Sequence, residues 1–415
     1  DLFRKCNTQT LKTDQRRKNV FKRSFHYVEP KPICLGQNES GKECFAQYIP
    51  VKQTVASLLQ SNVLEHWHSN TNVNSEQVLR DVWDGTNIEN NTMFEAKNSS
   101  LGLILYQEAF EVVNPLGSGK KKHKVLAVYA TLANILPHNR SNIDYMQLVL
   151  LCKEQDFKYF GQDLVFGSLI KDLKDLETSG ITMPDGKTFK GTVCAIAGDN
   201  LGSHCIGGFT ENFSKSLHFC RYCEIDRKTF LEDPLAKGQE RTENSYQEHV
   251  QTQSVGVKFD SLFNELTYFH VCQPGLPPCL GHDLFEGIVS FDLAIYIKHL
   301  VMVEKHFTYL DLNRRITQFK YLGSDAGNKP CEVNPGVEKL SGHAVQNWCF
   351  LRMLPVLIGD KMVNTVDSEV WQLILQLREI VDLITAPAIS TGQVAYLGVL
   401  IEEYLDSRRQ TFPYH

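Results

Sequence analysis

The stretch Thr188-Phe-Lys-Gly-Thr-Val-Cys-Ala-Ile-Ala-Gly-Asp199 decides the fold of this chain. It is short, apolar and rich in small or β-branched residues, which predicts a buried β-strand over 188–198. Asp199 follows the last apolar residue directly and leads into Asn200-Leu-Gly-Ser-His204. The pattern therefore predicts an acidic side chain at the end of a core strand.

The residues before this strand predict the rest of a sheet. Apolar residues at helical spacing over 163–177 predict a helix that Gly180 ends, and Pro184-Asp-Gly186 predicts a hairpin turn. Three earlier apolar runs predict strands joined by short turns, at 101–110, 125–131 and 145–152. Short connections favour an antiparallel meander, and a helical crossover favours a parallel fourth strand. This order is ribonuclease-H-like, so we expect an α/β protein with a mixed sheet.

The sequence as a whole predicts five regions. They are residues 1–85 (a basic arm with short helices at 49–59 and 75–83), 86–200 (the first part of the core), 201–281 (an insertion with a Cys-x-x-Cys), 282–304 (a core helix carrying a third acid) and 305–415 (an α-helical region). In the last region we expect helices at 368–384, with Asp367 as N-cap, and at 393–408. The chain begins with Asp1 and ends with His415, and we expect both ends to be truncated.

Composition excludes several classes of protein. The 415 residues are 42% apolar and 22% charged, which is typical of a globular protein. Charged residues interrupt the most apolar stretch, 284–301, so we expect no membrane span. Twelve scattered cysteines favour a reducing compartment. Because the net charge is −5, nucleic-acid contacts would have to come from local basic patches.

Three acids suggest metal-ion chemistry. Mg²⁺ and Mn²⁺ prefer oxygen ligands, and carboxylates from separate elements can hold two such ions for phosphodiester cleavage. Asp199 is one candidate, and Glu286 on the helix beginning near His282 is another. On the first strand Glu108 is preferred to Glu111, which faces the other way. The alternative is that these acids are ordinary caps and surface groups.

Cys220 and Cys223 form the one close Cys-x-x-Cys pair, a spacing that can place two thiolates on a structural Zn²⁺. The other ligands would come from a downstream Cys/His cluster, and His270 and His282 are the candidates. The alternative is a pair of unligated buried cysteines. A redox pair is disfavoured because no thioredoxin-like unit surrounds it.

Two basic clusters are candidates for phosphate contact. Residues 1–24 contain eight Lys or Arg and two acids, and the predicted hairpin after the first strand is rich in lysine. The predicted DNA-binding residues are Arg16, Arg17, Lys18, Lys120, Lys121, Lys122 and Lys124. The basic arm also suits a nuclear import receptor. Equally, both clusters can be solvated surface, since hairpin tips are often lysine-rich.

Several motifs, in this order and spacing, resemble the catalytic core of CACTA (En/Spm-type) DNA transposases. They are Phe110-Glu-Val-Val-Asn-Pro-Leu-Gly-Ser118, Ala197-Gly-Asp-Asn-Leu-Gly-Ser-His204, Phe219-Cys-Arg-Tyr-Cys223, Leu276-Pro-Pro-Cys-Leu-Gly-His-Asp-Leu-Phe-Glu-Gly287 and Leu340-Ser-Gly-His-Ala-Val-Gln-Asn-Trp-Cys-Phe-Leu-Arg-Met-Leu-Pro355. The likeness spans residues 101–355.

The resemblance implies a ribonuclease-H-like core, an Asp-Asp-Glu triad with Mg²⁺ or Mn²⁺, and a Cys-x-x-Cys in the insertion. Asp199 and Glu286 match the second and third acids, whereas Glu108 stands where relatives have Asp. Its extra methylene moves the carboxylate by about 1.5 Å, and catalytic sites tolerate about 0.5 Å, so we expect an impaired centre. The implied partners are DNA at transposon ends and targets and a further copy of the chain in a homo-oligomer, and the implied location is the nucleus. The alternative is a domesticated or decayed transposase-derived module that binds DNA or protein without catalysis.

Overall fold

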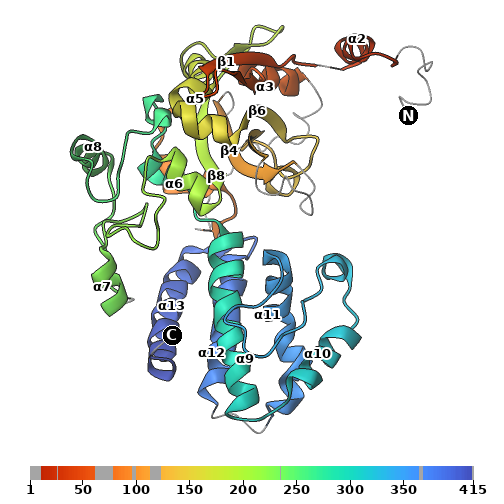
Figure 1. The fold of residues 1–415 in the computed structure, drawn as a ribbon, viewed down its shortest axis with the longest axis vertical. Helices are drawn as coiled ribbons and strands as arrows, with labels where there is room; N and C mark the ends of the chain where they lie inside the picture. The colour runs from red at the N-terminus through yellow and green to blue at the C-terminus, as the bar shows by residue number, and fades with distance from the viewer. Residues whose placement is uncertain are drawn as a thin grey trace. The chain divides into compact units, whose positions relative to one another are not determined.

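The chain forms two compact units. The computed structural model describes residues 11–25, 27–60, 78–95, 100–112, 123–233, 235–363 and 368–413. The first unit comprises Asp1–Val73, Asp81–Asp226 and Gly238–Pro277, and the second comprises Asn74–Arg80, Arg227–Lys237 and Pro278–His415. The first is mixed α/β and contains a curled mixed sheet, whereas the second is mainly helical (Figure 1).

The sheet has seven strands in the order β1-β2-β6-β5-β4-β8-β7. In the described residues the β4–β8 pair is parallel and the other neighbouring pairs are antiparallel. The strands are β1 (Lys31–Gln37), β2 (Glu43–Tyr48), β4 (Ser100–Glu111), β5 (Lys124–Leu132), β6 (Gln147–Lys153), β7 (Ile181–Thr182) and β8 (Thr188–Gly198). The predicted meander, crossover helix and parallel fourth strand are therefore present, and the β1–β2 hairpin is an addition that we did not predict.

Helix α5 (Glu154–Thr178) connects β6 to β8 and covers one face of the sheet (Figure 1). Leu101, Leu103 and Leu105 alternate along β4 and are fully buried in the same core as the apolar side chains of α5. Each such side chain stabilises the fold by roughly 1.5–3 kcal/mol. The helix starts nine residues earlier than predicted, because its apolar spacing is interrupted at Gly161 (φ 79°), where the helix kinks.

Turn chemistry at the end of α5 agrees with the prediction. Gly180 has a φ of 70° and its N–H donates to the carbonyl of Asp175, which ends the helix in the left-handed conformation that favours glycine. Gly186 (φ 86°) then forms the tight turn of the β7–β8 hairpin.

The predicted helix over 75–83 is wrong in its described part. Val78–Leu79 forms the short strand β3, and Val82–Asp84 forms the 3₁₀ turn η2. Asp81 caps η2 and also binds the guanidinium of Arg140. The Asp81 side chain thus satisfies backbone groups outside a helix, which overrides the apolar spacing.

The remaining elements of the first unit are short apart from three helices. Helix α3 agrees with the prediction for 49–59, and the described part of the Asn-rich segment after residue 85 contains the one-turn helix α4 and the 3₁₀ turn η3. The elements are α2 (Asp14–Ser24), α3 (Val51–Gln60), α4 (Thr86–Glu89), η3 (Thr92–Phe94), η4 (Pro137–Asn139), α6 (Asn200–Ile206), α8 (Glu243–Thr252), η5 (Leu262–Glu265) and the π-helical turn η6 (Val271–Gly275).

The second unit buries its own apolar core between helices. Helix α12 confirms the prediction for 368–384 and α13 contains the predicted 393–408, but the N-cap is Ser368 and not Asp367, which lies outside the described residues. The elements are β3, α7 (Arg227–Glu232), η7 (Leu280–Ile288, a π-helical turn), α9 (Val289–Met302), α10 (Tyr309–Gln318), η8 (Gly323–Gly327), α11 (Ala344–Ile358), η9 (Gly359–Lys361), α12 (Glu369–Ile384), β9 (Ile389–Ser390) and α13 (Thr391–Thr411).

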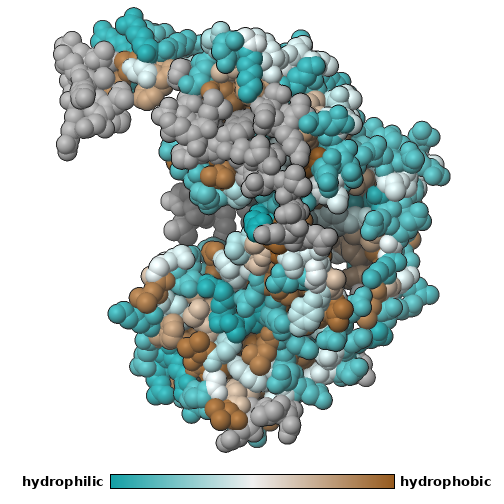
Figure 2. Space-filling view, turned by 180° about the vertical axis from the view of Figure 1, so that it is seen from behind, coloured by the Kyte–Doolittle hydropathy of each residue, from teal (hydrophilic) through white to brown (hydrophobic). Residues whose placement is uncertain are grey.

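Surface hydrophobicity is broken into separate patches. On the face drawn in Figure 2, hydrophobic residues lie in small groups among hydrophilic ones. Scattered apolar side chains of this kind are normal on folded domains. Among the helices that the structure describes, none has the length and apolarity that a bilayer span requires.

A buried polar network joins α9 to α13. Asp292 is 3% exposed and accepts hydrogen bonds from the Tyr404 hydroxyl and from Nε of Arg408, the latter at 2.8 Å. Tyr404 is also hydrogen-bonded to Tyr296 at 2.7 Å. Burial acts to lower the pKa of Arg408, but the hydrogen bond and charge of Asp292 outweigh it and raise that pKa. The buried Asp292 carboxylate therefore has both a salt bridge, to Arg408, and a hydrogen bond, from Tyr404.

We expect Asp292→Ala to lower the free energy of unfolding of the helical unit by about 3 kcal/mol, because it leaves Arg408 without its buried partner. Calorimetry of the full chain measures the loss. The control is Asp382→Ala, which removes an exposed acid 3.8 Å from Arg378 and should change stability by about 0.5 kcal/mol or less. Equal effects of the two variants would contradict a special role for the buried network.

Candidate functional site

The ends of β4 and β8 meet at one edge of the sheet. In the parallel register Gln107 pairs with Gly198, so the next residues, Glu108 and Asp199, follow side by side along the backbone. Asp199 is the N-cap of α6, and its Oδ1 accepts from the backbone N–H of Gly202 at 2.6 Å. The fold thus places the two sequence-predicted positions of the first unit at the same strand ends.

The side chains at the end of β4 face opposite sides. Successive residues of a strand alternate between faces, so Gln107 and Glu108 point away from each other. The Glu108 carboxylate accepts from the Tyr106 hydroxyl at 2.6 Å, on the face of even-numbered residues. Gln107 continues the row of buried leucines and is only 6% exposed. Its buried Oε1 has no hydrogen-bond partner among the described residues.

Gly202 shows which side chain adjoins Asp199. A Cβ at this position would lie 3.0 Å from Oδ1 of Asp199 and 3.2 Å from Nε2 of Gln107. Both side chains therefore border the same piece of the α6 backbone, and a larger residue there would push against them. The neighbour of Asp199 on this face is the neutral amide of Gln107. In the sequence, this position of Gln107 was indicated by its being a polar residue at the next odd-numbered position after Leu101, Leu103 and Leu105.

Cys220 and Cys223 lie together on a tight turn. The Tyr222 N–H donates to the Cys220 sulfur at 3.4 Å, and Cys223 forms an antiparallel bridge with Glu240. Burial, and to a smaller extent the neighbouring Cys220 thiol, raise the pKa of Cys223. The geometry agrees with the predicted Cys-x-x-Cys turn, whereas the zinc itself stays a prediction.

Arg221, between the two cysteines, ties this turn to its surroundings. Its guanidinium donates to Oδ1 of Asn200 at 2.7 Å and to the carbonyl of Pro277 at 3.1 Å. The Tyr222 hydroxyl donates to the carbonyl of Leu276 at 3.1 Å. One turn of the insertion therefore holds both the residue after Asp199 and the segment that ends the first unit. The sequence prediction for this turn concerned its two cysteines and did not identify the arginine between them.

His270 is buried and is hydrogen-bonded to the backbone through one ring nitrogen. Its Nδ1 accepts from the Cys272 N–H at 3.1 Å, and its Nε2 is buried without a partner among the described residues. Burial lowers the pKa of His270, and the nearby Glu243 and Asp260 offset part of that shift. The imidazole is therefore neutral at pH 7.

This depressed pKa predicts acid sensitivity of the first unit. Below pH 6.5 the unfolded chain binds a proton that folded His270 rejects, so stability present above pH 6.5 is lost as the pH falls towards the folded-state pKa. Hydrogen exchange of β8 amides at pH 7.5 and 5.5, corrected for intrinsic rates, should show this loss. His270→Phe should flatten it, and changing the exposed His138 to Phe should not. A pH response unchanged in His270→Phe would contradict the assignment.

Glu286 and His282 belong to the second unit, on the π-helical turn η7. Oε1 of Glu286 accepts from the N–H of Ala344, the first residue of α11, at 3.1 Å. Nδ1 of His282 lies 3.1 Å from the sulfur of Cys279. Wide π-helical turns are often found at functional sites. In this unit Glu286 acts as a cap for α11, which is the ordinary structural role weighed for it.

The predicted phosphate-binding residues are only partly described. Arg16, Arg17 and Lys18 lie on α2, which buries no residue, and Arg17 pairs with Asp14. Lys124 begins β5 opposite Glu111. Lys120, Lys121 and Lys122 lie outside the described residues.

The predicted metal ligands that the structure describes do not form one cluster. In the part of the chain that the structure describes, no three His, Cys, Asp or Glu side chains gather into a group that could hold a metal ion. Compared with known proteins, the chain matches no family model and no curated protein.

Proposed function

We propose that this chain is a transposase-like protein with a ribonuclease-H-like core, that DNA is its partner, and that it acts in the nucleus. The observation that carries the proposal is the parallel β4–β8 pairing after a three-strand meander and a helical crossover. In a ribonuclease-H-like core these neighbouring strand ends carry the catalytic acids, and Asp199 stands at one of them.

The ancestral chemistry would be metal-assisted phosphodiester cleavage followed by joining of the freed 3′-hydroxyl to target DNA. Mg²⁺ is normally held through carboxylates. The described residues do not fit this ion, because Asp199 has the Gln107 amide beside it and Glu108 lies on the other face. We therefore derive no catalytic step through a metal and propose that cleavage is impaired.

The same amide favours a second candidate, a transposase-derived module that binds DNA without cutting it. Because Gln107 is neutral, the site beside Asp199 has one negative charge fewer than a bound cation would need. Binding, in contrast, requires only basic side chains on the surface, and α2 supplies five of them between residues 16 and 23.

Placing an acid at position 107 tests the catalytic proposal. We expect Gln107→Asp to raise Mn²⁺-dependent nicking of plasmid DNA at least tenfold, since it puts a carboxylate on the face of Asp199. Adding Asp199→Ala should abolish the gain. Glu108→Asp alone should give none. The matched control is Gln47→Asp, on an exposed position of β2.

Each outcome has a separate meaning, provided that circular dichroism shows every variant folded. Cleavage gained by Glu108→Asp but not by Gln107→Asp would place the working acid at 108 and contradict the face argument. Retained DNA binding with no cleavage by any variant would select the non-catalytic module. Absence of both would reject the proposed action on DNA.

Neutralising α2 tests the DNA contact. We expect changing Arg16, Arg17 and Lys18 to Gln to weaken DNA binding and to reduce the slope of log K against log[salt] by about 2–3, because fewer counterions are released. Fluorescence anisotropy at several salt concentrations measures this slope. The control changes three exposed lysines of the same unit to Gln: Lys42, Lys158 and Lys171. An equal change in both triple variants would contradict a specific role for α2.

A further inference from the structure

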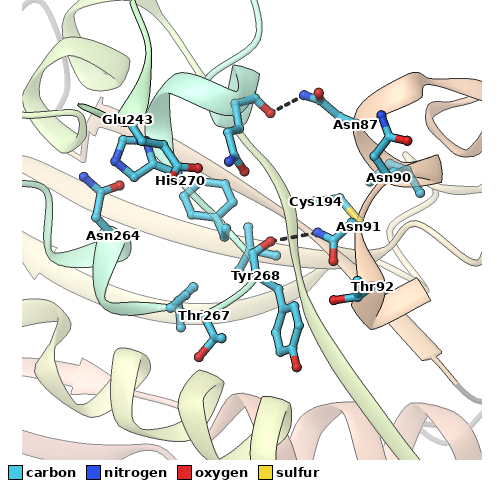
Figure 3. A pocket seen from close by; sticks show the side chains of 15 residues that line it. Asn87, Asn90, Asn91, Thr92, Cys194, Glu243, Asn264, Thr267, Tyr268 and His270 are labelled. Carbon is cyan, nitrogen blue, oxygen red and sulfur yellow. Dashed lines mark hydrogen bonds between the residues drawn. The ribbon is translucent and has the colours of Figure 1, made fainter. Parts of the chain in front are cut away.

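A cavity of about 390 Å³ opens in the first unit, away from the strand ends (Figure 3). One wall comes from α4, η3 and the residues between them, and another comes from the segment 264–273. Val193 and Cys194 of β8 also line it. Its size falls in the range of small-molecule sites. His270, a predicted zinc ligand, is the predicted site residue that lines this cavity.

The walls are held in place by hydrogen bonds across them. The Asn87 amide donates to the carbonyl of Gln273, and the Asn91 amide donates to the carbonyl of Tyr268 at 2.8 Å (Figure 3). Behind the second wall, the buried carboxylate of Glu177 accepts from the Thr267 N–H at 2.9 Å. The cavity is thus formed before any ligand arrives, which reduces the entropy cost of binding.

The chemistry of the lining selects the kind of ligand. None of the fifteen lining residues is Lys or Arg, and Glu243 is the one acid among them. Phosphates and carboxylates are therefore disfavoured. The other polar side chains are amides, hydroxyls, a thiol and an imidazole, so the lining suits a neutral ligand with several hydrogen-bonding groups. Tyr268 adds an aromatic ring at the wall (Figure 3).

His270 lies in the wall with its ring proton on a defined nitrogen. Because its Nδ1 accepts a backbone N–H, the proton of the neutral ring is on Nε2. That N–H is buried and meets no acceptor among the described residues, and leaving it unpaired costs free energy. Because Nε2 has almost no accessible surface, it does not donate to a ligand in the cavity as the wall stands; the Asn90 amide in the lining can donate there, and the exposed Glu243 carboxylate can accept from an N–H of the same ligand.

We propose that this cavity binds a nucleobase. Adenine, guanine and cytosine present adjacent acceptors and N–H groups at their edges, and any base can stack on an aromatic ring such as Tyr268. The choice of a nucleobase rests on the proposed function, whereas the donor and acceptor pattern does not. The base can come from a free nucleoside or from a DNA strand. Cys194 precedes Asp199 by five residues, about 17 Å along β8. A DNA strand with one base in the cavity would therefore span about five nucleotides to reach Asp199.

Blocking the cavity tests the proposal in the full chain. Thr267 has an exposed side chain and uses only its backbone N–H in the wall, so Thr267→Trp fills the cavity without removing a bond. Glu243→Gln removes the carboxylate acceptor. The controls lie later on α8 and do not line the cavity: Glu248→Gln is matched to Glu243→Gln, and Thr252→Trp introduces the same ring but also removes the hydrogen bond from the Thr252 hydroxyl to the Glu248 carbonyl.

Binding is measured in EDTA, which separates this test from strand cleavage. The probes are a single-stranded 12-mer carrying 2-aminopurine, the same 12-mer with abasic sites, and free nucleosides. We expect the 12-mer with bases to bind about tenfold more tightly than the abasic one, since stacking contributes at each base. Thr267→Trp and Glu243→Gln should reduce this difference, and the controls should preserve it.

A nucleoside that binds and is displaced by Thr267→Trp, with no base dependence in the 12-mer, identifies a free nucleoside as the source and supports the cavity. Base-independent binding of the 12-mer, with no nucleoside binding in wild type, overturns the proposal even if α2 still binds DNA. Equal losses in the cavity variants and their controls overturn it as well. Thermal unfolding midpoints within about 2 °C of wild type confirm that each variant is folded.

Discussion

The pairing of β4 with β8 is the constraint on which the first unit depends. Two parallel strands cannot be joined by a tight turn, so the chain needs a long crossover, and α5 supplies it. The crossover buries the odd-numbered face of β4 and brings the ends of both strands to one edge. The cap at Asp199, the short helix α6 and the Arg221 contact to Asn200 are all built on that edge.

A strand gives two successive residues opposite surroundings, and this decides the chemistry at the edge. A shift of one position exchanges the buried face for the open one. Gln107 shares the α6 backbone with Asp199, while Glu108 is bonded to Tyr106 on the other face. Glu108, the acid that the family resemblance aligns with the first catalytic position, is therefore not the side chain that borders the α6 backbone with Asp199. A family resemblance read along the chain gives no information about this difference.

Sequence predicted the parts of the fold in which apolar spacing is strong and local. Strands β4, β5, β6 and β8, and the helices α5, α12 and α13, follow that rule. The β1–β2 hairpin was not predicted, because the buried positions of β2 include the small residues Cys44 and Ala46, which give only a weak apolar alternation. At the site, Asp199 was predictable from the strand that it ends. The cavity was not, because its walls come from segments almost two hundred residues apart and are joined by Asn side chains that read as loop.

Glu177 carries a consequence for how this protein can change. Its carboxylate accepts hydrogen bonds from the Thr192 hydroxyl of β8, at 2.6 Å, and from the N–H of Thr267 in the cavity wall. The same side chain thus serves the stability of the core and the shape of the recess. Mutations that reshape the cavity through this wall must keep Glu177 or destabilise the core, and natural proteins have little stability to lose. Diversification is therefore directed to the side chains of Glu243 and Thr267, which line the cavity without bonding to Glu177.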